Sequence, residues 1–468
     1  MKGFDQMKIN SHITITKKYA AYLLIAVMLI LTISHTARAN ANSQPSQNLK
    51  LTKVVVLSRH NIRSPLSDNN SVLGKITPHK WFNWTSRPSE LSLRGAVLEV
   101  IMGQYFRLWL ESEGLFPENY IPEEGAVRFY ANAFQRTQAT ANYFSAGLLP
   151  VTRMQVERHV EYNQDDDTFL PKCFFFNDQY AKALHAEISK NAGNKGLSSY
   201  QEKLKGTYEL LIKILDVKKS KAFINGQIGD LLNDEITLKL EANKEPSLSG
   251  SLRLAVSIAD ALILQFYEEQ DDLKAAFGHK LTEDDWKRIG NILGTYESLL
   301  CSSPLFAING AHPMLKEIYS ELTQKERKFS YLCGHDSTIE AFLAALNVKD
   351  YILPNAIEPK TPIGVKVVFE RWEDASNASD IKNVAFYKIN IVYQSVDQLR
   401  KTQPLSLKNP PMIVPIFFTE LKTNEQGMVK EEELLMLLKS KIDAFYELEK
   451  IFDEDEKKNR EDTLKEAA

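Results

Sequence analysis

A nearly continuous apolar run at residues 51–57, Leu-Thr-Lys-Val-Val-Val-Leu, constrains the fold more than any other segment. Its β-branched residues predict a strand, and its lack of alternation predicts that both faces are covered, as in a parallel sheet. Helical periodicity follows at residues 96–109, a short strand is expected at 127–130, and a helix at 135–148. This alternation predicts an α/β fold: a doubly wound, mostly parallel sheet with helices on both faces.

The middle of the chain has a different character. Strand signals fade between residues 151 and 300, where helical patterns follow one another at 200–215, 252–268 and 284–300. Strand patterns then resume at 328–332, 365–369, 386–393 and 412–418, with a helix expected at 337–346. We therefore expect three parts after the N-terminus. They are an α/β core made of two segments, 40–150 and 301–450, an α-helical cap domain inserted between them at 151–300, and a charged tail at 451–468.

The N-terminus has the pattern of an export signal. Lys17 and Lys18 precede an uncharged apolar run at residues 20–33, and Ala37-Arg38-Ala39 follows it. This order is typical of a secretory signal peptide, here residues 1–39 with cleavage near Ala39. The run is shorter than the roughly 20 residues that span a bilayer, so we expect a periplasmic or secreted protein without stable membrane insertion. An uncleaved, membrane-anchored form is the alternative.

Charge and cysteine content exclude some classes of function. The formal net charge is −3, and removal of residues 1–39 would leave −7, so no nucleic-acid partner is expected. Cys173, Cys301 and Cys333 allow one disulfide at most, and none of them forms a CxxC pair of the kind that binds metals. The sequence leaves open whether a disulfide forms, and it does not set the oligomeric state.

The strongest chemical motif follows the first predicted strand directly: Ser58-Arg59-His60-Asn61-Ile62-Arg63. Ligands of open α/β sheets bind at the carboxyl ends of the strands. Guanidinium groups present planar forks to an oxyanion, and an imidazole between them can serve as nucleophile or acid. The motif therefore predicts a phosphate site, and a surface loop of unrelated polar residues is the alternative.

Two further motifs have the same placement after a strand. Gly334-His335-Asp336-Ser337 follows the strand at 328–332, where Gly334 permits a tight turn and the next helix offers its N-terminal amides to an anion. Gln135-Arg136-Thr137 opens the helix after the second strand. A helix cap by Asp336 or Ser337 and a solvent-facing Arg136 are the simpler alternatives. Two histidines and three arginines at three comparable strand ends nevertheless favour one shared oxyanion site.

These motifs carry a family resemblance. Arg59-His60-x-x-Arg63-x-Pro65, Gln135-Arg136-Thr137 and Gly334-His335-Asp336 resemble the three signatures of the histidine acid phosphatases, branch 2 of the histidine phosphatase superfamily. Other segments are most similar to bacterial periplasmic glucose-1-phosphatases, with periplasmic phytases next: residues 59–66, 77–81, 95–100, 361–364, 368–372 and 392–395. The resemblance extends over residues 53–437.

The resemblance implies a role for each motif residue. His60 would be the nucleophile that becomes a phosphohistidine, and Asp336 the proton donor to the leaving group. The phosphoryl oxygens would be bound by Arg59, Arg63, Arg136 and His335. Because arginines supply the positive charge, no metal and no cofactor are expected.

The same resemblance implies an acid phosphomonoesterase whose substrate is a small phosphomonoester, first of all glucose 1-phosphate or a similar sugar phosphate. A phytase or broad acid phosphatase is the alternative, and a catalytically dead phospho-ligand-binding protein a remote one. A phosphoryl-transferring mutase is disfavoured by the export signal and the cap.

Specificity is expected from the cap. Glu245-Pro246-Ser247 resembles the segment from which a glutamate of glucose-1-phosphatases reaches the sugar, so Glu245 would accept sugar hydroxyls and repel additional phosphates. A loop carboxylate in water is the alternative. His79, Trp81, Trp84 and Arg87, close to the first motif in sequence, are further candidates to line the pocket, but aromatic packing is the favoured role for the two tryptophans. Asn61 stands where many relatives have glycine, and asparagine tolerates the left-handed backbone better than most residues.

Overall fold

A computed structural model describes residues 49–66, 71–229, 232–374 and 384–466, with the side chains of 455–466 left out. The expected signal peptide, residues 1–39, lies outside the described residues. Leu49–Ala468 forms one compact unit. In the part of the chain described here, every helix is too short or too polar to cross a membrane.

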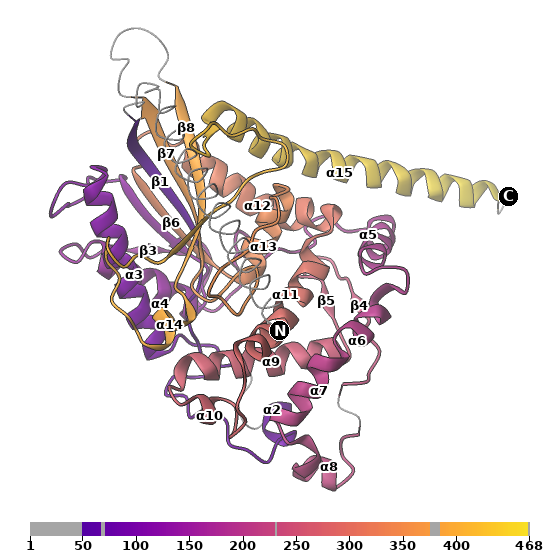
Figure 1. Ribbon diagram of the computed structural model, residues 1–468. Coiled ribbons are helices and arrows are strands. Elements are labelled where there is room, and N and C mark those ends of the chain that lie inside the picture. Colours follow the sequence, from indigo (N-terminus) through magenta and orange to yellow (C-terminus); the bar gives the residue numbers. More distant parts are fainter. Residues whose placement is uncertain (1–48, 67–70, 230–231, 375–383, 467–468) are drawn as a thin grey trace, which may run out of the picture. The chain divides into compact units, whose positions relative to one another are not determined.

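Eight described strands form the central sheet, in the order β10-β8-β7-β1-β6-β2-β3 with β9 beside β8 (Figure 1). Their bounds are β1 Leu49–Arg59, β2 Val127–Ala131, β3 Val156–Glu157, β6 Phe329–Gly334, β7 Lys366–Asp374, β8 Ala385–Tyr393, β9 Met412–Pro415 and β10 Val429–Lys430. The strands β1, β6, β2 and β3 pair in parallel, whereas β7, β8, β9 and β10 join through antiparallel pairs. The expected α/β sheet is confirmed, and its second half is antiparallel because β7 and β8 follow one another without a crossover helix.

Some helices connect these strands along the chain, and the helices of residues 178–301 form what we call the helical block (Figure 1). Those longer than nine residues are α3 Leu93–Ser112, α4 Gln135–Leu148, α5 Asp178–Asn191, α7 Lys205–Ile214, α9 Ser251–Glu268, α11 Glu283–Cys301, α12 Pro304–Thr323, α13 Asp336–Ala345 and α15 Glu431–Glu466. The shorter ones are α2 Val72–Lys75, α6 Ser199–Lys203, α8 Lys221–Ile224, α10 Asp272–Ala275 and α14 Val396–Arg400. Most predicted helices are confirmed, but the pattern at 200–215 is divided into α6 and α7, and α15 extends through most of the expected tail.

Both faces of β1 are buried, as its unbroken apolar run predicts. Val54 and Val56 pack in a cluster with Phe106 of α3 and Phe144 of α4, on one face of the sheet. Val55 and Leu57 belong to a second cluster on the other face, which contains Phe342 of α13. Successive residues of a strand point to opposite faces, so an unbroken apolar run is required when helices cover both.

The second cluster continues without a break into the helical block. It includes Leu262 of α9 and Ile292 of α11 together with the strand residue Val367. The short strand β3 lies within the expected cap region but pairs with β2, so the main sheet extends to Glu157. A small hairpin, β4 (Leu238–Lys239) with β5 (Ser247–Leu248), lies inside the helical block.

Candidate active site

Three neighbouring parallel strands bring the sequence motifs together. The carboxyl end of β1 carries Arg59 and His60, β6 leads into His335 and Asp336, and β2 leads to Arg136 in the first turn of α4. The His60 amide donates to the Gly334 carbonyl at 3.1 Å, which joins the first two of these ends. Segments nearly three hundred residues apart in sequence therefore meet at one edge of the sheet, where ligands of such folds bind.

The hydrogen bonding of His60 leaves one ring nitrogen free. Its Nδ1 lies 2.9 Å from the Asn61 carbonyl oxygen, which can only accept, so Nδ1 carries the proton and Nε2 keeps its lone pair. Burial, and then the positive charges of Arg136 and Arg63, place the pKa of His60 well below its ordinary value. The ring is 3 % exposed and neutral, which is the state of a nucleophile.

The arginines differ in their partners. Arg59 donates to Glu358 at 2.7 Å and pairs with Asp336 at 2.9 Å. It is not among the residues that line the pocket next to His60. Arg63 forms a bidentate pair with Asp260 at 3.0 and 3.1 Å. Arg136 has no carboxylate within ion-pair distance among the described residues, and burial with the charge of Arg63 lowers its pKa to about 10.

In all three arginines the Nε–H is buried and has no acceptor among the described residues, a feature that Arg107 and Arg327 share outside the site. Buried donors are normally satisfied, so three such groups around one site call for an explanation. An oxyanion bound between them would supply the missing acceptors.

His335 faces two donors. The side-chain Oδ1 of Asn132 accepts from the Ala133 amide at 2.8 Å, so it is the side-chain Nδ2 of Asn132 that lies 2.7 Å from His335 Nε2. The proton of the neutral ring is thus on Nδ1, 3.4 Å from Nη2 of Arg136. Burial and Arg136 place the pKa of His335 well below its ordinary value. The Nδ1–H of His335 and the Nη2–H of Arg136 are therefore two neighbouring donors. An acceptor between them would satisfy both, and a phosphoryl oxygen has that chemistry.

Asp336 is ionised in the free site. Burial by itself raises its pKa, but the charge of Arg59, with His335 and Arg63, outweighs burial and holds the pKa below its ordinary value. About a third of the side chain is exposed toward the pocket. The N-cap of α13 is His335, not Asp336 or Ser337, so the simpler capping explanation is wrong.

A buried ion pair supports the loop after β1. Lys366 and Glu99 are fully buried and 3.1 Å apart, and Glu99 also accepts from the Asn61 side chain at 2.6 Å. The expected reason for Asn61 is wrong: its φ is not positive, and the side chain is used for this bond and for capping the Ile62 amide. Gly364 is required beside it, because a Cβ there would lie 2.6 Å from the Asn61 amide nitrogen.

The role expected for Gly334 is also corrected. It is the last residue of β6 rather than part of a tight turn, and its φ is not positive. A Cβ at this position would lie 2.8 Å from Thr338 Oγ1 and 2.9 Å from the Phe169 ring. Close packing under the His335 segment therefore requires the glycine.

The pocket above these residues has a volume of about 430 Å³. Among its lining residues, we call His60, Arg63, Arg136 and His335 the floor, and Glu245, Glu297 and Arg253 the wall. Glu245 is exposed and accepts from Ser337 at 2.8 Å, which places it beside Asp336. Burial, with Asp336 and Glu245 next, raises the pKa of Glu297 well above its ordinary value.

Several residues of the site were not expected from the sequence. Asp260 and Glu358 hold Arg63 and Arg59, Asn132 orients His335, and Glu297 lies on the wall. Asp260, Glu358 and Glu297 neither follow a strand end nor belong to a motif, so no local signal marks their role. Asn132 directly follows β2, and this position at a strand end was the signal that could have identified it. Conversely, His79 and Arg87 do not line this pocket, and their expected place was wrong. Trp81 and Trp84 pack with the hydrophobic core, which is the role favoured for them.

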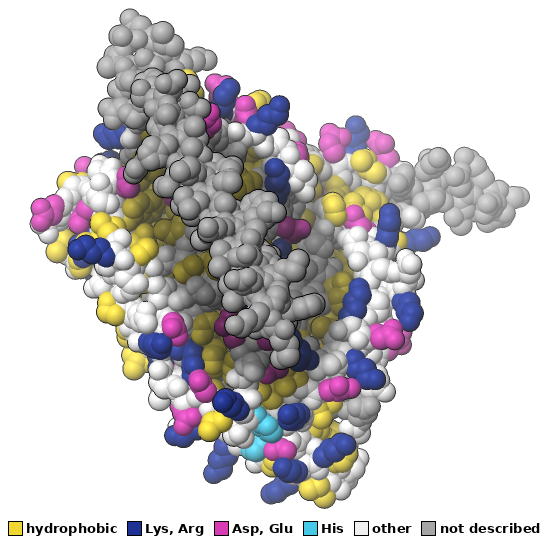
Figure 2. Space-filling view, viewed as in Figure 1, with side chains coloured by type: hydrophobic (Ala, Val, Ile, Leu, Met, Phe, Trp, Pro, Cys, Tyr) yellow, Lys and Arg dark blue, Asp and Glu magenta, His cyan; other side chains and the backbone are white. Residues whose placement is uncertain are grey.

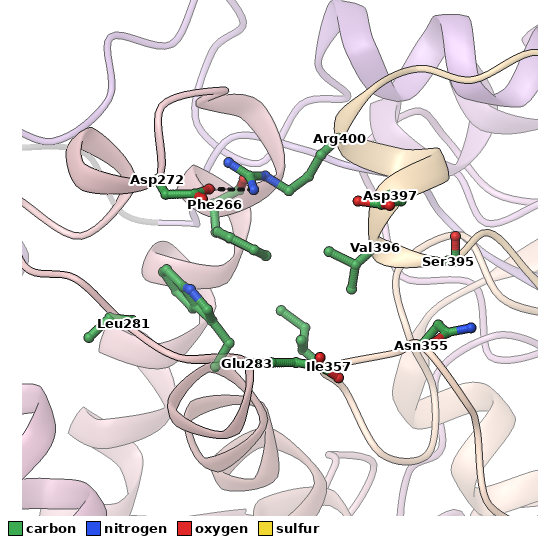
Figure 3. A pocket seen from close by; sticks show the side chains of 11 residues that line it. Phe266, Asp272, Leu281, Glu283, Asn355, Ile357, Ser395, Val396, Asp397 and Arg400 are labelled. Carbon is green, nitrogen blue, oxygen red and sulfur yellow. Dashed lines mark hydrogen bonds and ion pairs between the residues drawn. The ribbon is translucent and has the colours of Figure 1, made fainter.

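A second pocket, drawn in Figure 3, has no residue in common with the first. Arg400 points across it and pairs with Asp272 at 2.6 Å. The guanidinium also lies 4.1 Å from the Phe266 ring centroid and donates to the carbonyls of Phe266 and Glu269. Because its donors are satisfied within the protein, Arg400 acts as a structural tie.

The surface charges are mixed. On the described part of the face in Figure 2, Lys and Arg side chains are interspersed with Asp and Glu. Cys173, Cys301 and Cys333 are buried and unpaired.

Comparison with known proteins gives a consistent result. Residues 50–387 match the model of the histidine phosphatase superfamily (branch 2). The chain is 33% identical over 398 residues to glucose-1-phosphatase from Providencia rettgeri, covering 84% of this chain and 92% of that protein. It is 34% identical over 400 residues to glucose-1-phosphatase from Salmonella typhimurium, with the same coverage of 84% and 92%.

Among solved structures, the phytase from Citrobacter braakii is similar with a TM-score of 0.75 and 27% identity, covering 84% of this chain and 98% of that one. Together with the converging strand ends, these matches confirm the resemblance seen in the motifs. The chain belongs to the histidine phosphatase superfamily (branch 2), and it is a phosphomonoester hydrolase of that family.

Proposed function

We propose that the protein is an acid phosphatase that hydrolyses sugar phosphates, glucose 1-phosphate first among them, through a phosphohistidine on His60. The observation that carries this proposal is the neutral, buried imidazole of His60, whose Nε2 keeps its lone pair. It lies among three arginines whose Nε–H groups have no acceptor among the described residues. The names of the relatives from Providencia rettgeri and Salmonella typhimurium support the substrate.

In the first half-reaction, the phosphoryl group lies among Arg59, Arg63, Arg136 and the Nδ1–H of His335. His60 Nε2 forms a bond to phosphorus as the bond to the ester oxygen breaks. The charge that develops on the equatorial oxygens is stabilised by these preorganised donors, so the arginines supply what a metal ion supplies in other phosphoryl-transfer enzymes.

Asp336 would deliver the proton that the departing oxygen needs. In the free site Arg59 holds it ionised. A bound phosphate dianion competes for Arg59 and brings negative charge next to Asp336, and both effects raise its pKa toward protonation. In the second half-reaction the Asp336 carboxylate accepts a proton from water, the water oxygen attacks phosphorus, and His60 leaves as the neutral imidazole.

The wall of the pocket favours a substrate with a single phosphate. Both carboxyl groups offer hydrogen bonds to the hydroxyl groups of a sugar: Glu245 is exposed, and the raised pKa of Glu297 favours its neutral, protonated form. Among the described lining residues outside the floor, Arg253 is the one cation, so little positive charge is available to additional phosphates. Phytate, with several phosphates, is the second candidate because the Citrobacter braakii structure is named a phytase.

The test is phosphate release from glucose 1-phosphate, phytate and an aryl phosphate at mildly acidic pH, with and without EDTA. We expect glucose 1-phosphate to be preferred over phytate, rates unaffected by EDTA, and an acid-labile phosphoenzyme in rapid-quench samples. Loss of turnover in EDTA, or turnover without a phosphoenzyme in wild-type protein, would contradict the mechanism.

We also propose export to the periplasm or medium. Basic Lys17 and Lys18, the apolar run and the Ala37-Arg38-Ala39 site support it. N-terminal sequencing of the protein secreted by a bacterial host tests it, and a mature protein that retains residues 1–39 would contradict it.

A further inference from the structure

Two histidines and an aspartate from three separate segments converge outside the pocket of His60. His79 follows α2, Asp216 lies between α7 and the 3-10 helix Val217–Lys219, and His279 follows α10. Nε2 of His79 lies 2.9 Å from Oδ2 of Asp216, and Nε2 of His279 lies 3.8 Å from the same oxygen. Their side chains are 27, 22 and 26 % exposed, so all three are anchored in the protein and open to solvent on one side.

We propose that His79, Asp216 and His279 form a binding site for a divalent transition-metal ion of the zinc class, with water completing the coordination. Two imidazole nitrogens and one carboxylate oxygen are ligands that Zn²⁺ prefers, and hard ions such as Ca²⁺ and Mg²⁺ prefer oxygen alone. This site is separate from the phosphatase reaction and does not depend on the proposed function.

The spacing of the three groups fits such an ion. Metal–ligand bonds of about 2.0–2.2 Å in a tetrahedron place neighbouring ligand atoms roughly 3.3–3.6 Å apart. The two distances to Asp216 Oδ2, 2.9 and 3.8 Å, bracket that range. All three ligand atoms lie within 4.8 Å of one another. Small rotations of side chains would therefore complete the site without movement of the backbone.

The ligands are held in place before any ion binds. The His79 ring stacks on Phe277 at 4.9 Å with an interplanar angle of 6°. Asp216 and Phe277 both have left-handed backbones, with φ of 49° and 53°, and the amide of His279 is bonded to the Ala276 carbonyl at 3.0 Å. Preorganised ligands lose little conformational entropy on binding.

The neighbouring charge is compatible with an ion. Lys219 pairs with Oδ1 of Asp216 at 2.9 Å and is 73 % exposed, so Oδ2 stays available and the lysine can withdraw into solvent. When the ion binds, two metal–nitrogen bonds and one metal–oxygen bond form. The proton that a ring shares with Asp216 in the ion-free protein moves to its other nitrogen or to solvent.

A bound ion would tie together segments 137 and 63 residues apart in sequence, at residues 79, 216 and 279. Its main consequence is therefore expected to be stability of this part of the helical block. An ion at a concentration 100-fold above its Kd should raise the Tm of a chain this size by roughly 3 °C.

The experiment titrates the chelator-treated, full mature protein with ZnCl₂ and measures Zn²⁺ affinity by competition with a chromophoric chelator, and Tm by calorimetry. We expect one ion per chain and the stated rise in Tm. His79→Gln and His279→Gln should each weaken binding by roughly 100-fold or more, because loss of an outer-shell partner alone typically costs about 10- to 100-fold. His185→Gln, which changes an exposed histidine of α5, is the matched control and should leave binding unchanged.

Each other outcome overturns the proposal. No Zn²⁺ binding by wild type would end it. Binding retained in both histidine variants would place the ion elsewhere, such as at His60 and His335, whose ring centroids lie 5.5 Å apart. Loss of Zn²⁺ binding in His79→Gln alone would show that His279 is not a ligand, which contradicts the proposed three-residue site. Should either variant fail to fold, as judged by circular dichroism, Asp216→Asn takes its place and should also weaken binding.

Discussion

The floor of the pocket, formed by His60, Arg63, Arg136 and His335, presents positive charge and hydrogen-bond donors, whereas the wall carries the carboxyl groups of Glu245 and Glu297. The two sets are supported differently. The floor residues follow directly from strand ends or open a helix, and His60 and His335 are at most 4 % exposed. Glu245 lies in an exposed segment before β5, and Glu297 lies on α11.

Under the proposed function, this difference separates chemistry from selection. The donor-rich floor would favour one phosphoryl group, and the wall, with Arg253 as its cation, would offer little positive charge to a second phosphate. Changes to the floor should therefore reduce the rate on every substrate, while changes to the wall should alter the ratio between substrates.

The largest effect is expected from His60→Ala. Removal of the nucleophile should lower kcat by roughly 10³-fold or more on all monoesters, because the covalent path is lost. Initial-rate measurements of phosphate release test this, with His185→Ala as an exposed histidine control. A loss below tenfold would mean that His60 is not the nucleophile.

Asp336→Asn should lower kcat by about 10²- to 10⁴-fold for alkyl phosphates, the range expected for a general acid. Aryl phosphates have better leaving groups and should be affected less. Equal losses for both leaving groups would show that Asp336 does not donate the proton.

Lys366→Met should destabilise the protein by roughly 3–5 kcal/mol, because it leaves the fully buried Glu99 without a partner beneath the floor. Urea denaturation measures this, and Lys430→Met on β10, an exposed lysine, is the control. Adding Glu99→Gln to Lys366→Met should recover part of the loss. A destabilisation under about 1 kcal/mol would mean that the buried pair does not support the floor.

Glu245→Lys should raise the ratio of kcat/KM for phytate to that for glucose 1-phosphate at mildly acidic pH by about three- to tenfold, since a positive charge beside Asp336 attracts the additional phosphates. Glu297→Gln should change this ratio little, because the raised pKa of Glu297 favours its neutral, protonated form. Glu283→Lys, at an exposed position of the same helix α11, is the control and should leave the ratio unchanged. An unchanged ratio in Glu245→Lys would remove the wall from substrate selection.

The smallest effect concerns pH. Burial and Arg136 lower the pKa of His60, so its imidazole should remain neutral at pH values below 6.5 and lose its lone pair only below the lowered pKa. An imidazole with the ordinary pKa of about 6.5 would be protonated about 30-fold over its neutral form at pH 5. Histidine-selective NMR titration measures this, and a His60 signal that titrates near pH 6.5 would contradict the assignment.

Much of the floor could be predicted because each of its motifs follows a strand or opens a helix. Apolar runs identify the strands, and ligands bind at their carboxyl ends, so Arg59, His60 and His335 could be assigned together. The antiparallel half of the sheet was missed because strand patterns do not reveal direction. His79 was misplaced because closeness in sequence to His60 does not imply closeness in space.

The sequence by itself determined the family, the strand-end motifs and the type of chemistry, because these depend on residue types at short, fixed spacings. Only the tertiary structure decided which carboxylates hold Arg59 and Arg63, that Glu297 and Glu245 line one pocket, and that His79, Asp216 and His279 meet. Those groups join residues 52 to 299 positions apart. Packing of helices and loops brings them together, and no local pattern encodes it.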